Sequence, residues 1–166
     1  MTLLGMCEWL EATALGLLVR ESVYGFQIFV AIHILALTLS VGTLVWFDLR
    51  LLGVSMVRCR VSELYRRIMP WMLTGFVIMF VSGAALFTGY ATNAYANFYF
   101  RIKLVALLVA GVNALVFHRV TERHMAEWDR APRPPASARL AGLISITVWT
   151  IVIMAGRMMA YTLYSF

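Results

Sequence analysis

Two histidines stand inside segments that are otherwise apolar. His33 lies within the first long apolar run of the chain, and His118 lies toward the end of the third. An ionisable side chain in hydrocarbon is costly unless something pairs with it, so its presence there suggests a functional site. Neutral imidazole binds iron well, and haem proteins commonly hold their cofactor between facing helices. The two positions therefore predict a b-type haem with His33 and His118 as axial metal ligands.

Arg157 is a third ionisable residue at membrane depth, in the last apolar run. A buried guanidinium requires an anionic partner. A haem propionate would supply one, with help from Arg101 or Lys103, and Asn113 would share a polar contact with His118. The alternatives are that Arg157 extends to the membrane surface or binds backbone carbonyl groups.

The relative depth of the two histidines depends on how the helices align. If the outer ends align, at Glu21 and Lys103, the histidines lie within a few Å of each other. If the inner ends align, at Asp48 and Arg119, roughly 20 Å separate them, at a rise of about 1.5 Å per residue. In that case His33 needs a different axial partner, and the candidates are Met79, Met154, Met158 and Met159.

Other chemistries find less support in the sequence. The chain has ten methionines, and thioether sulfur binds Cu(I), but methionine is also common filler of apolar cores. His124 lies in an arginine-rich connection, where a solvated surface position is expected. No HExxH, Walker-loop or G-x-S-x-G pattern occurs, so the sequence gives no sign of hydrolytic or phosphoryl-transfer chemistry.

The composition places these residues in a membrane. Hydrophobic residues make up 62% of the 166 residues, charged residues 13%, and the mean hydropathy is +0.83. We predict an all-α fold with one transmembrane domain over residues 1–166. The domain would be a four-helix bundle with spans over about 23–47, 68–90, 101–119 and 140–163, preceded by an amphipathic interfacial helix over about 3–20. No length remains for a soluble catalytic domain.

The distribution of charge predicts the topology. The arginines gather in the connections around 55–67 and 119–139, and the net charge is +6. By the positive-inside rule both connections are cytoplasmic, which puts both termini on the periplasmic side of a bacterial inner membrane. Cys7 and Cys59 then lie on opposite sides and cannot form a disulfide. The first residues lack a basic leading segment, so we expect no cleaved signal peptide.

Several short motifs along the chain carry a resemblance. They are the Trp-Leu-Glu start, the Arg-Glu-Ser before the first span, DLRLLG at its end, NALVFH in the third span and AGRMMAY in the fourth. They resemble an uncharacterised family of small bacterial inner-membrane proteins with four helices and a domain of unknown function. The layout is also similar to membrane b-type cytochromes and CopD-like copper proteins. That resemblance implies His33, His118 and Arg157 as the motif-bearing positions.

We therefore expect a haem b-binding electron-transfer subunit that links a periplasmic partner to the quinone pool. One alternative is a cofactor-free accessory or assembly subunit of a larger membrane complex. Another is a protein that transports copper or a small solute. In each case the expected partners are membrane lipid and either a protein partner or a second copy of the chain, with quinone as a further ligand and no nucleic acid. An electron-transfer or accessory role is favoured over a self-sufficient enzyme.

Overall fold

The computed structural model describes residues 2–131 and 133–164, and this part of the chain is helical without any strand. Four helices are long and apolar enough to cross a membrane. They are α3 (Gly25–Leu51), α4 (Val61–Gly89), α6 (Phe98–Val116) and α8 (Ala136–Tyr164). The predicted all-α fold with four membrane-spanning helices is confirmed.

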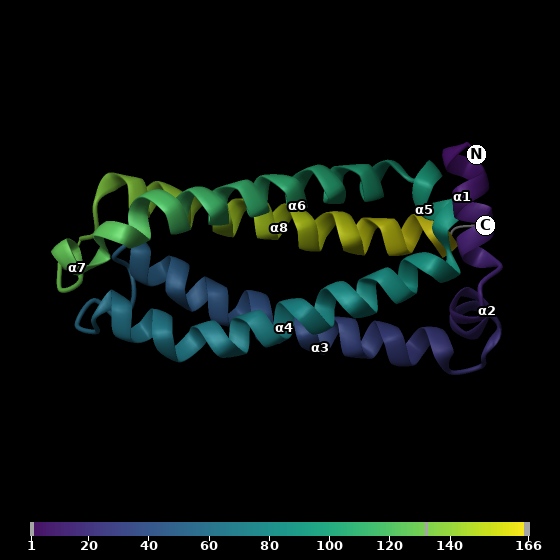
Figure 1. Cartoon of the computed structure of the whole chain (residues 1–166), viewed down its shortest axis with the longest axis horizontal. Coiled ribbons are helices and arrows are strands. Elements are labelled where there is room, and N and C mark those ends of the chain that lie inside the picture. Colours follow the sequence, from purple (N-terminus) through teal and green to yellow (C-terminus); the bar gives the residue numbers. More distant parts are fainter. Residues whose placement is uncertain (1, 132, 165–166) are drawn as a thin grey trace.

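The helices pack as two pairs (Figure 1). α3 packs most extensively on α4, and α6 packs most extensively on α8. A smaller contact between α3 and α8 joins the pairs, whereas α4 and α6 hardly touch within the described part of the chain. The bundle is therefore closed along α3 and α8 and loosely packed between α4 and α6.

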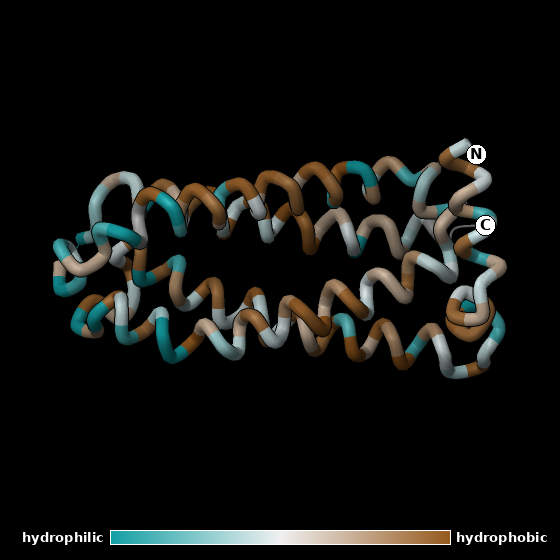
Figure 2. Tube along the Cα trace, in the orientation of Figure 1, coloured by the Kyte–Doolittle hydropathy of each residue, from teal (hydrophilic) through white to brown (hydrophobic). Residues whose placement is uncertain are grey.

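The two ends of the bundle differ in composition. One end, here called the terminal end, carries both termini together with α1 (Leu3–Glu11), α2 (Ala14–Glu21) and α5 (Ala91–Ala96) (Figure 1). The other, here called the arginine-rich end, carries the two long connections. The second connection contains η1 (Phe117–Thr121), η2 (Glu122–His124) and α7 (Met125–Trp128). Hydrophilic residues gather at the arginine-rich end, and hydrophobic residues predominate along the spans (Figure 2).

The helix that contains the second predicted span starts before that span. The predicted span starts near residue 68, whereas α4 begins at Val61 and has Pro70 inside it. The reason is a cap supplied by the other connection: Asp129 accepts hydrogen bonds from Ser62 N at 2.7 Å and from Ser62 Oγ at 2.9 Å. A carboxylate that binds free N–H groups stabilises a helix start.

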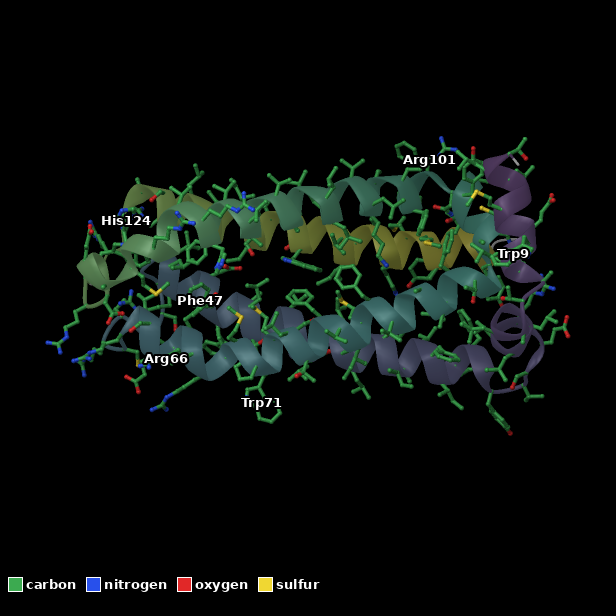
Figure 3. All side chains as sticks on the ribbon, viewed as in Figure 1. Trp9, Phe47, Arg66, Trp71, Arg101 and His124 are labelled. Atoms are coloured by element: carbon green, nitrogen blue, oxygen red, sulfur yellow. The ribbon has the colours of Figure 1, made fainter. Side chains whose placement is uncertain are left out.

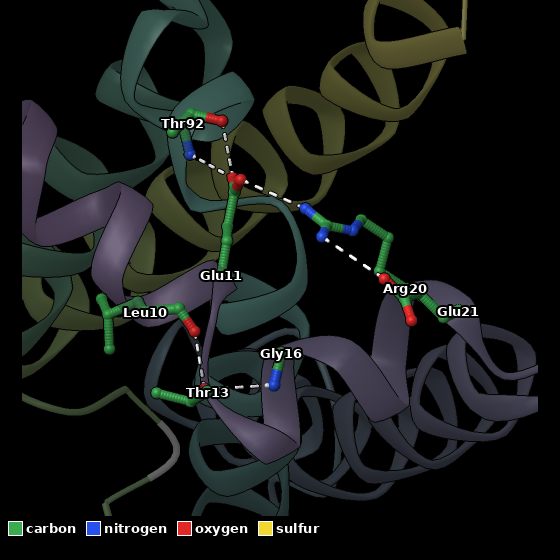
Figure 4. A network of polar contacts seen from close by, with 7 residues as sticks. All are labelled: Leu10, Glu11, Thr13, Gly16, Arg20, Glu21 and Thr92. Carbon is green, nitrogen blue, oxygen red and sulfur yellow. Dashed lines mark hydrogen bonds and ion pairs between the residues drawn. The ribbon is translucent and has the colours of Figure 1, made fainter.

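The predicted interfacial helix is two short helices, α1 and α2, that meet at Thr13. The Thr13 side chain caps α2 by accepting from Gly16 N at 3.2 Å. Glu11 Oε1 accepts hydrogen bonds from Thr92 N at 2.7 Å and Thr92 Oγ1 at 2.6 Å, and its Oε2 lies 3.4 Å from Arg20 Nη1 (Figure 4). This network ties both short helices to α5, across the terminal end of the bundle.

Arg50 holds the arginine-rich end together. Its side chain is 0% exposed, its Nε donates to Cys59 O at 3.0 Å, and its Nη2 donates to Ala131 O at 3.1 Å. Each carbonyl belongs to a different connection. One buried guanidinium at the end of α3 therefore fixes both long connections against the bundle.

Candidate functional site

A pocket of about 470 Å³ lies between α4 and α6, where the two helix pairs separate. Volumes of this order suit small-molecule ligands. α3 and α8 form its floor, and the lining is mainly apolar. The polar lining residues are few: Asp48, Tyr65, Asn113, His118 and Ser145.

The mouth of the pocket faces outward between α4 and α6. Several of its lining residues are also exposed: Leu73 and Phe80 on α4, and Gly111 and Ala114 on α6. These positions belong to the two spans that hardly touch, so the opening lies along the length of the bundle. In a membrane it faces the lipid.

The pocket is polar at one end and apolar at the other. Its polar residues lie on the part of each helix nearer the arginine-rich end, as Asp48 does near the end of α3. Toward the middle of the spans the lining is Phe76, Phe80, Leu107 and Trp149. This distribution matches an amphiphile whose polar head lies near the arginine-rich end and whose apolar part points to the centre of the bilayer.

Asp48 is the most unusual polar residue of the pocket. It is 3% exposed, and its Oδ2 is buried without any hydrogen-bond partner among the described residues. The carboxyl group interacts with the Ser145 hydroxyl of α8. The two helices approach closely here because residue 142 is glycine: a Cβ atom at Gly142 would lie 3.1 Å from Asp48 O. A buried polar atom without a partner is costly, so it marks a place where a ligand can bind.

In the sequence, Asp48 stands out only as a boundary residue of the first predicted span. The structure continues α3 to Leu51, which places Asp48 inside the helix and in the bundle interior. A carboxylate within the apolar run VWFDLRLL was a signal for this position, by the same reasoning that was applied to the histidines.

His33 faces its neighbouring helix in the other half of the bundle. The ring is half-buried on α3, and its Nδ1 lies 3.1 Å from Ser82 Oγ of α4. Gly83 makes room for the ring, since a Cβ atom there would lie 3.0 Å from His33 Cε1. Lys103 of α6 is close enough to interact electrostatically with the imidazole.

His118 lies at the other level of the bundle, on the exposed rim of the pocket in η1. The adjacent Phe117 ring packs against Phe47 of α3, with ring centroids 5.7 Å apart. The stretch of α3 from His33 to Phe47 covers roughly 20 Å, at a rise of about 1.5 Å per residue. The first and third spans are therefore aligned at their inner ends, near Asp48 and Arg119. This alignment does not bring His33 and His118 together around one cofactor.

The other predicted site residues are also dispersed. Arg157 is exposed, with its guanidinium 4.9 Å from the centroid of the Tyr161 ring. Arg101 is exposed as well: it donates to Tyr95 O at 3.3 Å and points away from the bundle (Figure 3). Of the three predicted propionate partners, only Lys103 is partly buried, and it lies within electrostatic range of His33.

Asn113 occupies the pocket rather than the surroundings of a haem. Its Nδ2 donates to Ala141 O of α8 at 3.0 Å, which leaves its Oδ1 as an acceptor. His124 is exposed and its Nδ1 lies 3.1 Å from Val120 O. Within residues 2–131 and 133–164, no group of three His, Cys, Asp or Glu side chains is placed to hold a metal ion. The two cysteines are free, Cys7 at the terminal end and Cys59 at the arginine-rich end.

Comparison with known proteins identifies a family for this chain. Curated protein sequences and solved structures gave no significant match. A family model matches residues 6–162, nearly the whole chain, and its description is a family of unknown function. The chain therefore belongs to the DUF6644 family.

Proposed function

We propose that this protein binds a lipid-soluble amphiphile of the quinone class within the membrane and serves as a membrane electron-transfer or accessory subunit. The observation that carries the proposal is the buried Asp48 Oδ2, which lacks a partner and stands in an otherwise apolar pocket. A quinone combines an apolar chain with a compact polar ring, which matches the two ends of the pocket.

The position of the mouth supports entry from the lipid. A ligand that slides between α4 and α6 passes apolar side chains such as Leu73 and Phe80 and need not cross an aqueous surface. Because α4 and α6 make almost no contact, few interactions have to break to admit it.

The expected topology predicts on which side of the membrane the head group of the ligand lies. We infer from the positive-inside rule that the arginine-rich end is cytoplasmic in a bacterial inner membrane and that both termini are periplasmic. Asp48 lies about one turn from the end of α3. The ring of a bound quinone would then lie near the cytoplasmic interface, with its chain in the hydrocarbon.

The test is binding of decylubiquinone to the purified protein in lipid nanodiscs. Trp149 lines the pocket, so its fluorescence should fall as the site fills. A Trp149→Phe variant should lose the saturable part of the quenching and thereby separate the signal of Trp149 from that of the other four tryptophans.

Two glycine variants provide a matched pair for this test. Gly111 lines the pocket and Gly42 does not, and a Cβ atom at either position would meet nothing within 4 Å. Gly111→Leu should therefore weaken binding at least about tenfold, or about 1.4 kcal/mol, while Gly42→Leu leaves it unchanged. Quenching that never saturates, or equal binding by the two variants, would contradict the proposal.

Haem binding at His33 is a second proposal, and one observation favours it. The contact of Nδ1 with Ser82 Oγ fixes the ring and leaves Nε2 available, which is how metal-binding histidines are commonly oriented. Lys103 would be the cation nearest a propionate. A haem held there would supply one-electron transfer.

A dithionite-reduced minus air-oxidised spectrum of protein made with ample haem tests this second proposal. With His33 as the ligand, a b-type α-band should disappear in His33→Ala and persist in His118→Ala. A featureless wild-type spectrum would rule out haem, and loss of the band in both variants would contradict a site at His33 alone.

A further inference from the structure

We infer that Asp48 makes the α4–α6 pocket selective for a head group that carries a hydroxyl, so that the preferred ligand is the reduced quinol and not the quinone. The inference rests on the proposed function and specifies the form of the ligand that binds. It follows from the hydrogen-bonding groups that the pocket leaves open.

Two acceptor oxygens in the pocket receive no hydrogen bond from the described residues. Asp48 Oδ2 is buried and without a partner. The Nδ2 of Asn113 is engaged by Ala141 O, and no donor from the described residues reaches its Oδ1. The Ser145 hydroxyl already interacts with the Asp48 carboxyl group. A ligand that brings hydroxyl donors therefore provides what these oxygens lack.

The preference for a hydroxyl is strongest when Asp48 is ionised, and the free acceptor Oδ1 of Asn113 maintains it when Asp48 is protonated. An ionised carboxylate only accepts hydrogen bonds, whereas a protonated carboxyl group also donates one. A quinol hydroxyl can donate and accept, so it pairs with either form. A quinone carbonyl only accepts, so it pairs with the protonated form alone and faces repulsion between lone pairs with the ionised one.

An ammonium head group would also donate hydrogen bonds, but the charge of the surroundings opposes it. The pocket's polar end lies at the arginine-rich end, where Arg58, Arg60, Arg119 and Arg123 are exposed. This positive potential disfavours a cation that approaches from the interface. A neutral hydroxyl meets no such penalty.

The experiment compares decylubiquinol with decylubiquinone in anaerobic titrations of the nanodisc protein, followed by the fluorescence of Trp149. Wild type should bind the quinol about tenfold more tightly than the quinone, or about 1.4 kcal/mol. Asp48→Asn keeps the shape of the side chain and adds an amide donor that suits a carbonyl. It should abolish the preference while the quinone still binds.

Thr38→Ala is the control for these measurements, because Thr38 is exposed on α3 and does not line the pocket. It should retain the wild-type preference. If quinol and quinone bind equally to wild type, or if Asp48→Asn keeps the preference, the inference is wrong. A Gly111→Leu effect that persists in that case would leave the proposed function standing, whereas absence of saturable binding by either ligand overturns both.

Discussion

His33 Nδ1 lies 3.1 Å from Ser82 Oγ, and this contact links α3 to α4 within the membrane-spanning part of the bundle. The Ser82 hydroxyl donates to carbonyl groups of its own helix, and its Oγ lies 2.7 Å from Ile78 O. The hydroxyl is buried, so its removal leaves the imidazole without this side-chain partner. The contact should therefore stabilise the packing of α3 against α4 by a measurable free energy.

We expect Ser82→Ala to lower the free energy of unfolding by about 1 kcal/mol, the usual size of one such hydrogen bond. Thermal unfolding in detergent measures the change. Thr38→Ala is the control, because Thr38 is exposed on α3 and its hydroxyl binds only Ile34 O of the same helix. Equal effects of the two substitutions would show that the contact with His33 contributes nothing.

The crossing of α3 and α4 depends on Gly75. A Cβ atom there would lie 2.7 Å from Ser40 N, which is backbone that cannot easily move away. We expect Gly75→Ala to destabilise the protein by about 1–3 kcal/mol, as overpacking does elsewhere. Gly42→Ala should instead be neutral or stabilising, because it meets nothing within 4 Å and alanine favours helix. Thermal unfolding of both variants measures the change. A Gly75→Ala variant as stable as wild type would refute the close crossing of α3 and α4.

Loss of the Arg50 side chain should release both connections at the arginine-rich end. Arg50→Ala removes the bonds to Cys59 O and Ala131 O and leaves these two carbonyl groups without this donor. We expect faster hydrogen exchange in residues 52–60 and 129–131 together, with little change at the terminal end. Arg66→Ala is the control, since Arg66 is exposed on α4 (Figure 3). Faster exchange in only one connection would disagree with a shared anchor.

The network around Glu11 should hold the short helices across the terminal end. Glu11→Ala removes the acceptor for Thr92 N and Thr92 Oγ1 and the partner of Arg20. Hydrogen exchange in α1, α2 and α5 should then become faster, while α3 and α4 stay protected at their centres. Glu8→Ala tests whether any loss of charge has this effect, because Glu8 is exposed on α1. Similar exchange in both variants would mean that Glu11 does not act as a tie.

The sequence by itself determined that the chain is an all-α membrane protein with four spans and charged connections. Long apolar runs must satisfy their backbone hydrogen bonds internally in lipid, and most arginines gather in the connections because a charge is costly in lipid, so hydropathy and charge suffice for that prediction. It also singled out His33, which faces the bundle interior. These properties depend on each segment alone, and the surrounding fold does not alter them.

Only the tertiary structure decided which residues meet. The depth of His33 relative to His118 depends on the helix ends, and those are set by contacts between distant segments, such as the cap that Asp129 gives to α4. The pocket exists because α3–α4 and α6–α8 pack as pairs and leave α4 apart from α6. The burial of Asp48 in that pocket follows from this pairing, since periodicity within one helix cannot specify which neighbour a given face will meet.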